Sequence, residues 1–225
     1  MSPSTVESRT TEQLVDLARA LVTPGRRSFL GITGAPGAGK STLAEALVEA
    51  LDGDAVLVSM DGFHLRDDEL TRLGRRERKG AIDTFDVAGY LHLLRRLQDR
   101  TDAVVYAPVF DRGLEESIGS AFAVPAEVPL VVTEGNYLLA DEGDWAQVGP
   151  LLDRCWFLEP GEDVRLDRLV ARHQRFGRSP EEAWERSTGS DGRNAALVAS
   201  TRARASLVVT VADPWTNPPA GPGAG

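Results

Sequence analysis

The chain has 225 residues, enough for one large domain whose buried core needs no disulfide or metal ion to hold it together. Hydrophobic residues make up 42% of the sequence and charged residues 26%, which excludes a mostly disordered chain. The 25 Lys and Arg residues against 34 Asp and Glu residues give a net charge of −9, which argues against a general nucleic-acid or membrane-surface binder.

The predicted elements begin with an amphipathic helix within residues 1–24, where apolar side chains recur at helical spacing: Leu14, Leu17, Ala18, Leu21 and Val22. Apolar, β-branched runs then predict strands at 28–33, 55–60, 103–109, 129–134, 155–160 and 207–212. Helical patterns separate or follow these strands at 40–52, 66–74, 86–98, 144–153, 163–176 and 180–204. Apolar strands separated by helices indicate a mainly parallel sheet covered on both faces, a three-layer α/β domain over residues 25–214. The Pro- and Gly-rich residues 215–225 predict a flexible tail.

The sequence also lacks the patterns of secreted and membrane proteins. It has no stretch of the roughly 18 apolar residues that a membrane helix needs. The first 22 residues include acidic side chains and no apolar signal core. The single cysteine, Cys155, lies in the apolar run "CWFL" and is interpreted as a core residue. We therefore expect a cytoplasmic protein without nucleic-acid or membrane partners; a homodimer stays open.

The strongest motif is "GAPGAGKS", residues 34–41, which matches the P-loop pattern between a predicted strand and a predicted helix. Its glycines let backbone N–H groups turn toward a phosphate, and the following helix directs its positive end at the same anion. Lys40 is one of only two lysines in the chain, with Lys79, and is expected to reach the β- and γ-phosphates. Ser41 is the expected Mg²⁺ ligand. The nucleotide-binding residues are Gly34, Ala35, Pro36, Gly37, Ala38, Gly39, Lys40, Ser41 and Thr42.

Other classes of P-loop protein fit the sequence less well than a small-molecule kinase. No asparagine is followed by lysine, so the base-recognition element of guanine-specific GTPases is missing, and no "SGGQ"-like signature of transporter ATPases occurs. A kinase needs a group that accepts the proton of the acceptor hydroxyl near the γ-phosphate. Asp61 follows the strand at 55–60 and is the predicted base, whereas a helix-capping or Mg²⁺-linked role is the alternative. Glu134 ends the strand at 129–134 and is the predicted second metal residue, whereas an acidic strand end without a metal role is the alternative.

Arginines are concentrated between residues 165 and 178, where five Arg and one Asp give a local charge of +4. Arg168, Arg172 and Arg175 share a helix face, so their guanidinium groups could close over a triphosphate and stabilise developing charge. We interpret residues 165–180 as a lid in which Arg168 and Arg172 are catalytic, with Gly177 as its hinge. A solvated surface helix is the alternative interpretation.

Several short sequence strings, in their order along the chain, resemble those of the uridine kinase, phosphoribulokinase and type I pantothenate kinase group of P-loop kinases. More narrowly, the chain resembles the short bacterial nucleoside/nucleotide kinase-like or sugar kinase-like members of that group. The strings are "GAPGAGKS", "SMDGFHL", "RKGAIDTFD", "YAPVFDR", "TEGNYLL" and "RLVARHQRFGRSPEEA". The resemblance covers residues 28–212 and implies the P-loop nucleoside triphosphate hydrolase-like fold. It implies Asp61 as base, Glu134 near the metal and lid arginines at 168 and 172. It also implies an acceptor pocket formed by Asp83, Phe85, Tyr106 and Arg112.

Some of these residues have a second interpretation. Phe85 and Tyr106 could equally be core aromatics, and His64, placed here with the substrate-binding residues, could be a structural hydrogen-bond partner. Phosphoribulokinases and type I pantothenate kinases are usually longer, and uridine kinases tend to differ from "FDRGLEES" on the acceptor side. The sequence therefore predicts an ATP- and Mg²⁺-dependent kinase acting on a small-molecule alcohol, with nucleoside, sugar and pantothenate-like acceptors all open. The alternative is an ATP-binding regulatory or switch protein without a small-molecule acceptor.

Overall fold

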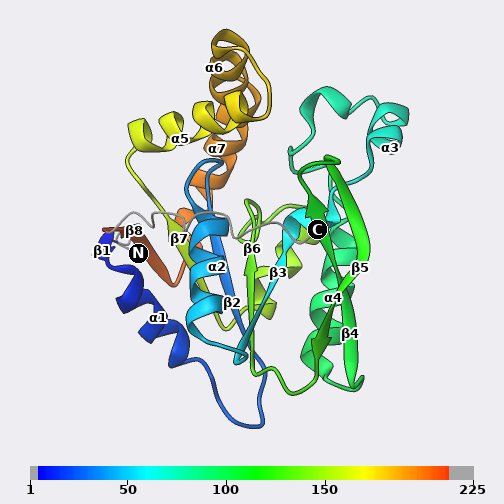
Figure 1. Cartoon of the computed structure of the whole chain (residues 1–225), viewed down its shortest axis with the longest axis vertical. Helices are drawn as coiled ribbons and strands as arrows, with labels where there is room; N and C mark the ends of the chain where they lie inside the picture. Colours follow the sequence, from blue (N-terminus) through cyan, green and yellow to red (C-terminus); the bar gives the residue numbers. More distant parts are fainter. Residues whose placement is uncertain (1–4, 213–225) are drawn as a thin grey trace, which may run out of the picture.

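The computed structural model describes residues 5–212, in which six parallel strands form one sheet (Figure 1). In spatial order the strands are β1 (Glu7–Arg9), β8 (Leu207–Val211), β7 (Arg154–Leu158), β2 (Ser28–Gly34), β6 (Leu130–Glu134) and β3 (Ala55–Ser59). β2 lies at the centre and is buried along its whole length. Its neighbours β7 and β6 pair with it in register, Leu30 beside Arg154 and Leu130 beside Ser28.

Helices cover both faces of this sheet, which confirms the predicted three-layer α/β architecture. α1 (Thr11–Arg19) and α2 (Lys40–Ala50) pack on one face, where their apolar side chains meet those of β2, β6 and β7. α4 (Val87–Asp99) and α7 (Ser190–Ser200) pack on the other face with the aromatic part of the core. The single cysteine, Cys155, is buried in that second layer, as its apolar surroundings predicted.

The predicted strand at 103–109 does not join the parallel sheet. It forms β4 (Val104–Asp111), which pairs antiparallel with β5 (Glu116–Pro125) in a separate hairpin. The side chains of β4 alternate between exposed and buried, a pattern of a strand with one solvated face. β5 was not predicted, because glycine, serines and alanines interrupt its larger apolar side chains and only one of its ten residues is buried.

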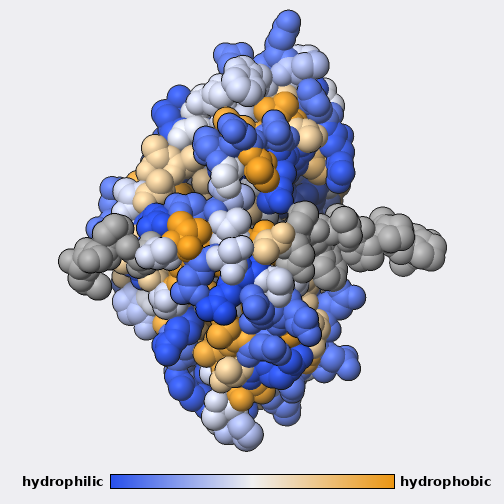
Figure 2. All heavy atoms as spheres, turned by 90° about the vertical axis from the view of Figure 1, so that its left-hand side faces the viewer, coloured by the Kyte–Doolittle hydropathy of each residue, from blue (hydrophilic) through white to orange (hydrophobic). Residues whose placement is uncertain are grey.

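The predicted N-terminal helix is present as α1, and a short strand precedes it. Thr10 caps this helix in a capping box with Gln13, and its buried residues Leu14, Val15 and Ala18 face the sheet. β1 extends the sheet by pairing Glu7 with Val209 of β8. On this side of the molecule, Figure 2 shows mostly hydrophilic residues with hydrophobic ones in small groups. The predicted tail at 215–225 lies outside the described residues.

Two predicted helices differ from the observed elements. The region 144–153 forms two 3-10 turns, Gly143–Gln147 and Gly149–Leu151, and Pro150 suits the first positions of the second because its φ is fixed near the helical value. The region 180–204 divides into α6 (Pro180–Thr188), α7 and a 3-10 turn at Arg202–Arg204, with the break at Gly189. Among residues 5–212, no helix is both long and apolar enough to cross a bilayer.

Two groups of elements rise beyond the carboxyl ends of the central strands (Figure 1). On one side stand α5 (Glu162–Arg175) and α6, with α7 behind them. On the other side stand α3 (Asp67–Arg72), the short 3-10 turns Met60–Phe63 and Arg76–Arg78, and the β4–β5 hairpin. We call these the helix wall and the hairpin wall. The parallel strands deliver their last residues to the space between them, which is where ligands bind in such sheets.

Candidate active site

The loop at residues 34–41 leads from β2 into α2 with the backbone that a phosphate site needs. Gly37 and Gly39 have φ values of +86° and +93°, a left-handed region that favours glycine. A Cβ at Gly37 would also lie 2.6 Å from the carbonyl oxygen of Arg165, so only glycine fits beneath α5. No side chain caps the first turn of α2, which leaves its N–H groups available to an anion.

Lys40 opens α2 and is buried in this loop. Its ammonium donates to the Ala35 carbonyl at 3.2 Å. Burial lowers the Lys40 pKa to about 8, and the carboxylates of Glu134 and Asp61 oppose that shift. The free protein therefore holds a buried cation within the field of two carboxylates, a charge that a phosphate would neutralise.

Asp61 and Glu134 come from adjacent strands whose ends lie in register, Ser59 of β3 beside Glu134 of β6. The Ser59 hydroxyl links them, since it donates to the Glu134 carboxylate at 2.6 Å and accepts from the Asp61 backbone N–H at 3.1 Å. Burial and the nearby Asp61 raise the pKa of Glu134, while Lys40 counteracts this. The Arg112 guanidinium lies 3.6 Å from the Asp61 carboxylate and forms an ion pair with it.

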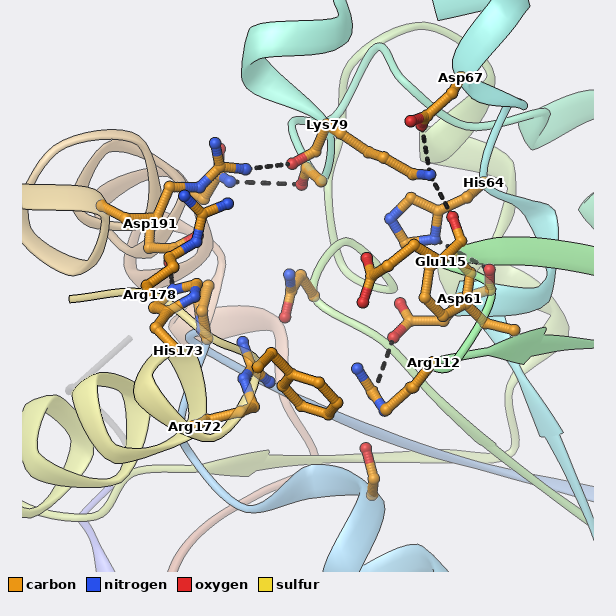
Figure 3. A pocket seen from close by; sticks show the side chains of 18 of the residues that line it. Asp61, His64, Asp67, Lys79, Arg112, Glu115, Arg172, His173, Arg178 and Asp191 are labelled. Atoms are coloured by element: carbon orange, nitrogen blue, oxygen red, sulfur yellow. Dashed lines mark hydrogen bonds and ion pairs between the residues drawn. The ribbon is translucent and has the colours of Figure 1, made fainter. Parts of the chain in front are cut away.

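A cavity of about 800 Å³ lies between the two walls and contains these groups (Figure 3). It is lined by half of the predicted site residues: Pro36, Lys40, Ser41, Asp61, His64, Phe85, Arg112, Glu134 and Arg172. Asp61 and Arg112 lie on the hairpin wall, and Arg172 lies opposite on α5. Residues that are far apart in the sequence therefore meet at the end of the sheet.

Outside the phosphate loop, three predicted residues do not line this cavity. Asp83 is not among its lining residues and pairs with Arg75 and Arg78, so its charge is already balanced. Tyr106 is 60% exposed, because it points away from the core on β4, between buried residues on either side. Arg168 lines a separate hollow of about 350 Å³ beside the phosphate loop.

That second hollow is mostly apolar and is lined by another part of the phosphate loop. Ala38, Gly39 and Thr42 form one side, and Val164 and Arg168 of α5 form another. Residues of β8 and Thr11 at the start of α1 close it. The start of the N-terminal helix and the strand β8 therefore contribute to a hollow that adjoins the phosphate loop.

His64 stacks within a short row of aromatic rings on the hairpin wall. Its ring centroid lies 4.1 Å from that of Phe85 and 4.8 Å from that of Phe110. Its Nδ1 lies 2.9 Å from the carbonyl oxygen of Asp61. Burial lowers the His64 pKa, which Asp61 partly opposes, so the neutral ring is favoured.

Several residues lining the cavity were missed at the level of sequence: Lys79, Glu115, Asn136, His173, Arg178, Arg186, Asp191 and Asn194. His173 of α5 and Asp191 of α7 form a hydrogen bond of 2.7 Å within the helix wall. Arg178 follows α5 inside the predicted lid. Lys79, Glu115, Asn136 and His173 lie within strings that bear on the family resemblance. Arg186, Asp191 and Asn194 had no sequence signal, because their positions depend on how loops and helices meet across the cavity.

No group of three or more His, Cys, Asp or Glu side chains in residues 5–212 is arranged to hold a metal ion by itself. Ser41 and Glu134 nevertheless line the same cavity as Lys40. This donor set suits an ion that is bound largely by the oxygens of a nucleotide, with few protein ligands.

Comparison with known proteins identifies relatives over most of the chain. A family model described as an AAA domain matches residues 30–190. A candidate uridine kinase of Schizosaccharomyces pombe is 32% identical over 83% of this chain and 84% of its own length. An uncharacterised Escherichia coli protein, YggC, is 30% identical over 85% and 81%. The crystal structure of a candidate fructose transport system kinase from Silicibacter sp. TM1040 superposes with a TM-score of 0.81 at 34% identity, covering 89% of this chain and 99% of that one.

Proposed function

The chain belongs to the AAA domain family, among the P-loop kinases, and on this premise we propose that it transfers the γ-phosphoryl group of ATP to a hydroxyl group of a small molecule. The observation that carries the proposal is the meeting of Lys40, Asp61 and Glu134 in one cavity. A cation for phosphate and two carboxylates at adjacent strand ends are the groups that phosphoryl transfer requires.

On the nucleotide side, the glycine backbone and the first turn of α2 would bind phosphate oxygens through N–H groups. Lys40 would neutralise the terminal phosphates, and the apolar hollow lined by Thr42 and Val164 would take the base. Ser41 and Glu134 would hold Mg²⁺ together with the phosphates. The ion supplies charge neutralisation during transfer.

On the acceptor side, Asp61 would orient the hydroxyl group and accept its proton, since it lies in the cavity at the end of β3. Arg112 holds the Asp61 carboxylate from the hairpin wall. Arg172, on the opposite wall, would face the transferring group and balance its charge. Arg168 would contact the nucleotide from the second hollow.

Nucleosides, sugars and pantothenate-like alcohols are all candidate acceptors for this reaction. The relatives carry different names, one for a uridine kinase and one for a fructose transport system kinase. Both names denote a kinase.

The proposal is tested by incubating the full chain with ATP, Mg²⁺ and a panel of nucleosides, sugars and pantothenate. ADP release is followed by a coupled assay, and phosphorylated products are identified by mass spectrometry. We expect ADP release to rise severalfold with at least one acceptor and a product heavier by one phosphoryl group. ATP binding or hydrolysis that no acceptor changes would contradict the proposal and favour a nucleotide-dependent switch.

A further inference from the structure

Lys79, the second of the two lysines, joins two segments at the end of the cavity. Its side chain is 14% exposed, and its ammonium donates to the Asp67 carboxylate at 2.6 Å. The same ammonium donates to the backbone carbonyl of Glu115 at the tip of the β4–β5 hairpin. It also lies 5.5 Å from the centre of the Phe110 ring. Lys79 therefore fixes the hairpin tip against the loop that follows α3.

The loop that contains Lys79 is itself held from several sides. Arg186 on α6 donates to two of its carbonyls, that of Lys79 at 3.1 Å among them. The next carbonyl, of Gly80, accepts from the Tyr137 hydroxyl at 2.7 Å and from the Asn194 amide at 3.3 Å. These contacts fix the backbone around Lys79, so its ammonium is held in position to contact the hairpin.

Glu115 is the residue that this arrangement orients. Its φ of +55° is a left-handed conformation that non-glycine residues adopt uncommonly, often at functional sites. The Asp111 carboxylate supports this turn by accepting from the N–H groups of Gly113 and Leu114. Figure 3 shows the Glu115 side chain directed from the hairpin wall into the cavity. Its carboxylate makes no hydrogen bond or ion pair within residues 5–212, and its charge acts on Arg172 of the opposite wall only through space.

A second acceptor of hydrogen bonds lies beside Glu115. A carbonyl oxygen can only accept, so the contact with the Asp61 carbonyl places the His64 proton on Nδ1. Because the ring is favoured in its neutral form, Nε2 remains a bare acceptor. The hairpin wall therefore offers a carboxylate and an imidazole nitrogen to groups that donate hydrogen bonds.

The cations of the same wall already have partners. Lys79 and Arg76 both pair with Asp67, and Arg112 pairs with Asp61. The guanidinium groups that line the cavity with neither a hydrogen bond nor an ion pair in the described chain are those of Arg172 and Arg178, both in the predicted lid. A bound anionic group on the hairpin wall would face hydrogen-bond acceptors that cannot donate to it. The cations of that wall are already paired with carboxylates, so the anion would be buried without a partner, which is unfavourable.

We propose that the phosphate acceptor is an uncharged, hydroxyl-rich molecule, that Glu115 accepts hydrogen bonds from its hydroxyl groups, and that Lys79 is the positioning residue for Glu115. The inference rests on the proposed function, because it assigns the second substrate of the same cavity. It excludes acceptors whose carboxylate or phosphate group would occupy the hairpin wall.

Direct binding to matched pairs tests the acceptor class without requiring turnover. Calorimetric titrations of the full chain with Mg²⁺ and a non-hydrolysable ATP analogue, whose γ-phosphate occupies the position that a product's phosphate would take, compare ribose with ribose 5-phosphate, fructose with fructose 1-phosphate, glucose with gluconate, and uridine with uridine monophosphate. We expect the uncharged member of at least one pair to bind at least tenfold more tightly than its anionic partner. Tighter binding of the anionic members, or no binding by any compound, would overturn the inference.

The role of Glu115 is tested by Glu115→Gln, with Glu45→Gln as a matched control. Glu45 is an exposed residue of α2 outside both cavities, so its variant loses the same charge elsewhere. Loss of a charge-assisted hydrogen bond predicts roughly tenfold weaker binding of the uncharged acceptor in Glu115→Gln and no change in Glu45→Gln. Unchanged acceptor affinity in Glu115→Gln would refute the role of this residue.

Lys79 is tested by its effect on KM and by a conservative rescue. Lys79→Met is expected to raise the acceptor KM several-fold with little change in the ATP KM or kcat, and Lys79→Arg is expected to restore most of the affinity. Comparable changes in the acceptor KM, the ATP KM and kcat would instead indicate that Lys79 has a general structural role, and would contradict its positioning role. An uncharged acceptor that binds through Glu115 but is never phosphorylated would disprove the kinase proposal alone. Turnover confined to an anionic acceptor would disprove this inference alone.

Discussion

The guanidinium of Arg165 on α5 donates a hydrogen bond to the carbonyl of Pro36 in the phosphate loop, over 2.9 Å. The Arg165 side chain is 5% exposed, and its other nitrogens bond to the Glu162 carboxylate. The helix that contains Arg172 is therefore attached directly to the loop that contains Lys40. Any displacement of the first turns of α5 would disturb the phosphate site.

Arg165→Met should consequently weaken ATP binding. The variant leaves the Pro36 carbonyl without its donor, which should cost about 1–3 kcal/mol of stability and raise the ATP KM roughly tenfold. Chemical unfolding and steady-state kinetics measure the two effects. Glu162→Gln is the matched control, since its carboxylate is 66% exposed and the ion pair should contribute less than about 1 kcal/mol. Equal effects in both variants would contradict the role of the Pro36 contact.

Asp61→Asn tests the proton acceptor of the proposed reaction. The amide keeps the size of the side chain but cannot accept the hydroxyl proton, so kcat should fall by about 10²–10⁴-fold. The ATP affinity should change little, because the amide lies on the acceptor side of Lys40. Calorimetric titration with a non-hydrolysable ATP analogue verifies that the nucleotide site is intact. A kcat near that of the unmodified protein would show that Asp61 is not the base.

The phosphate loop, the parallel sheet and the strand-end carboxylates could be predicted because each depends on a local pattern. The glycines and Lys40 lie within eight consecutive residues, and Asp61 and Glu134 directly follow or end apolar runs. The carboxyl ends of parallel strands lie at the same edge of a sheet, so the position of such residues does not depend on the conformation of the loops. Residues on the acceptor side lie in loops and in the hairpin, whose conformation no local sequence pattern predicts. Glu115 reaches the cavity only because a hairpin of two unremarkable strands folds over the end of β3.

The same reasoning explains the predicted residues that lie elsewhere. Asp83 and Phe85 are two positions apart, yet only Phe85 lines the cavity, because the loop turns Asp83 toward Arg75 and Arg78. A family resemblance identifies the segment that surrounds a substrate, but which side chain faces inward depends on the local path of the backbone.

Gly62→Ala should separate the hairpin from the catalytic aspartate. A Cβ at Gly62 would lie 2.8 Å from the carbonyl oxygen of Pro108 in β4, a backbone atom that moves only with its strand. We expect a loss of about 1–3 kcal/mol in stability and a higher acceptor KM, with the ATP KM unchanged. Gly119→Ala in β5 is the control, because a Cβ there meets nothing within 4 Å. Similar kinetics for the two variants would refute close packing at Gly62 as a determinant of the acceptor site.

His64 should make the folded state sensitive to acid. Burial lowers its pKa, which Lys79 and Arg112 reinforce and Asp61 opposes, so the unfolded chain binds the proton more readily than the folded one. Stability should therefore fall as the pH drops below the ordinary histidine value of about 6.5, by at most about 1.4 kcal/mol per pH unit from this group.

The measurement is the free energy of unfolding in urea at pH 7.5 and pH 5.5. In His64→Gln the amide can still donate to the Asp61 carbonyl, while the titrating group is gone. The variant loses ring packing at both pH values, so the informative quantity is the difference between them, which should be smaller than in the unmodified protein. His92→Gln, which replaces an exposed histidine of α4, should leave that difference unchanged. If His64→Gln lost as much stability between the two pH values as the unmodified chain, the buried imidazole would not be the source of the acid sensitivity.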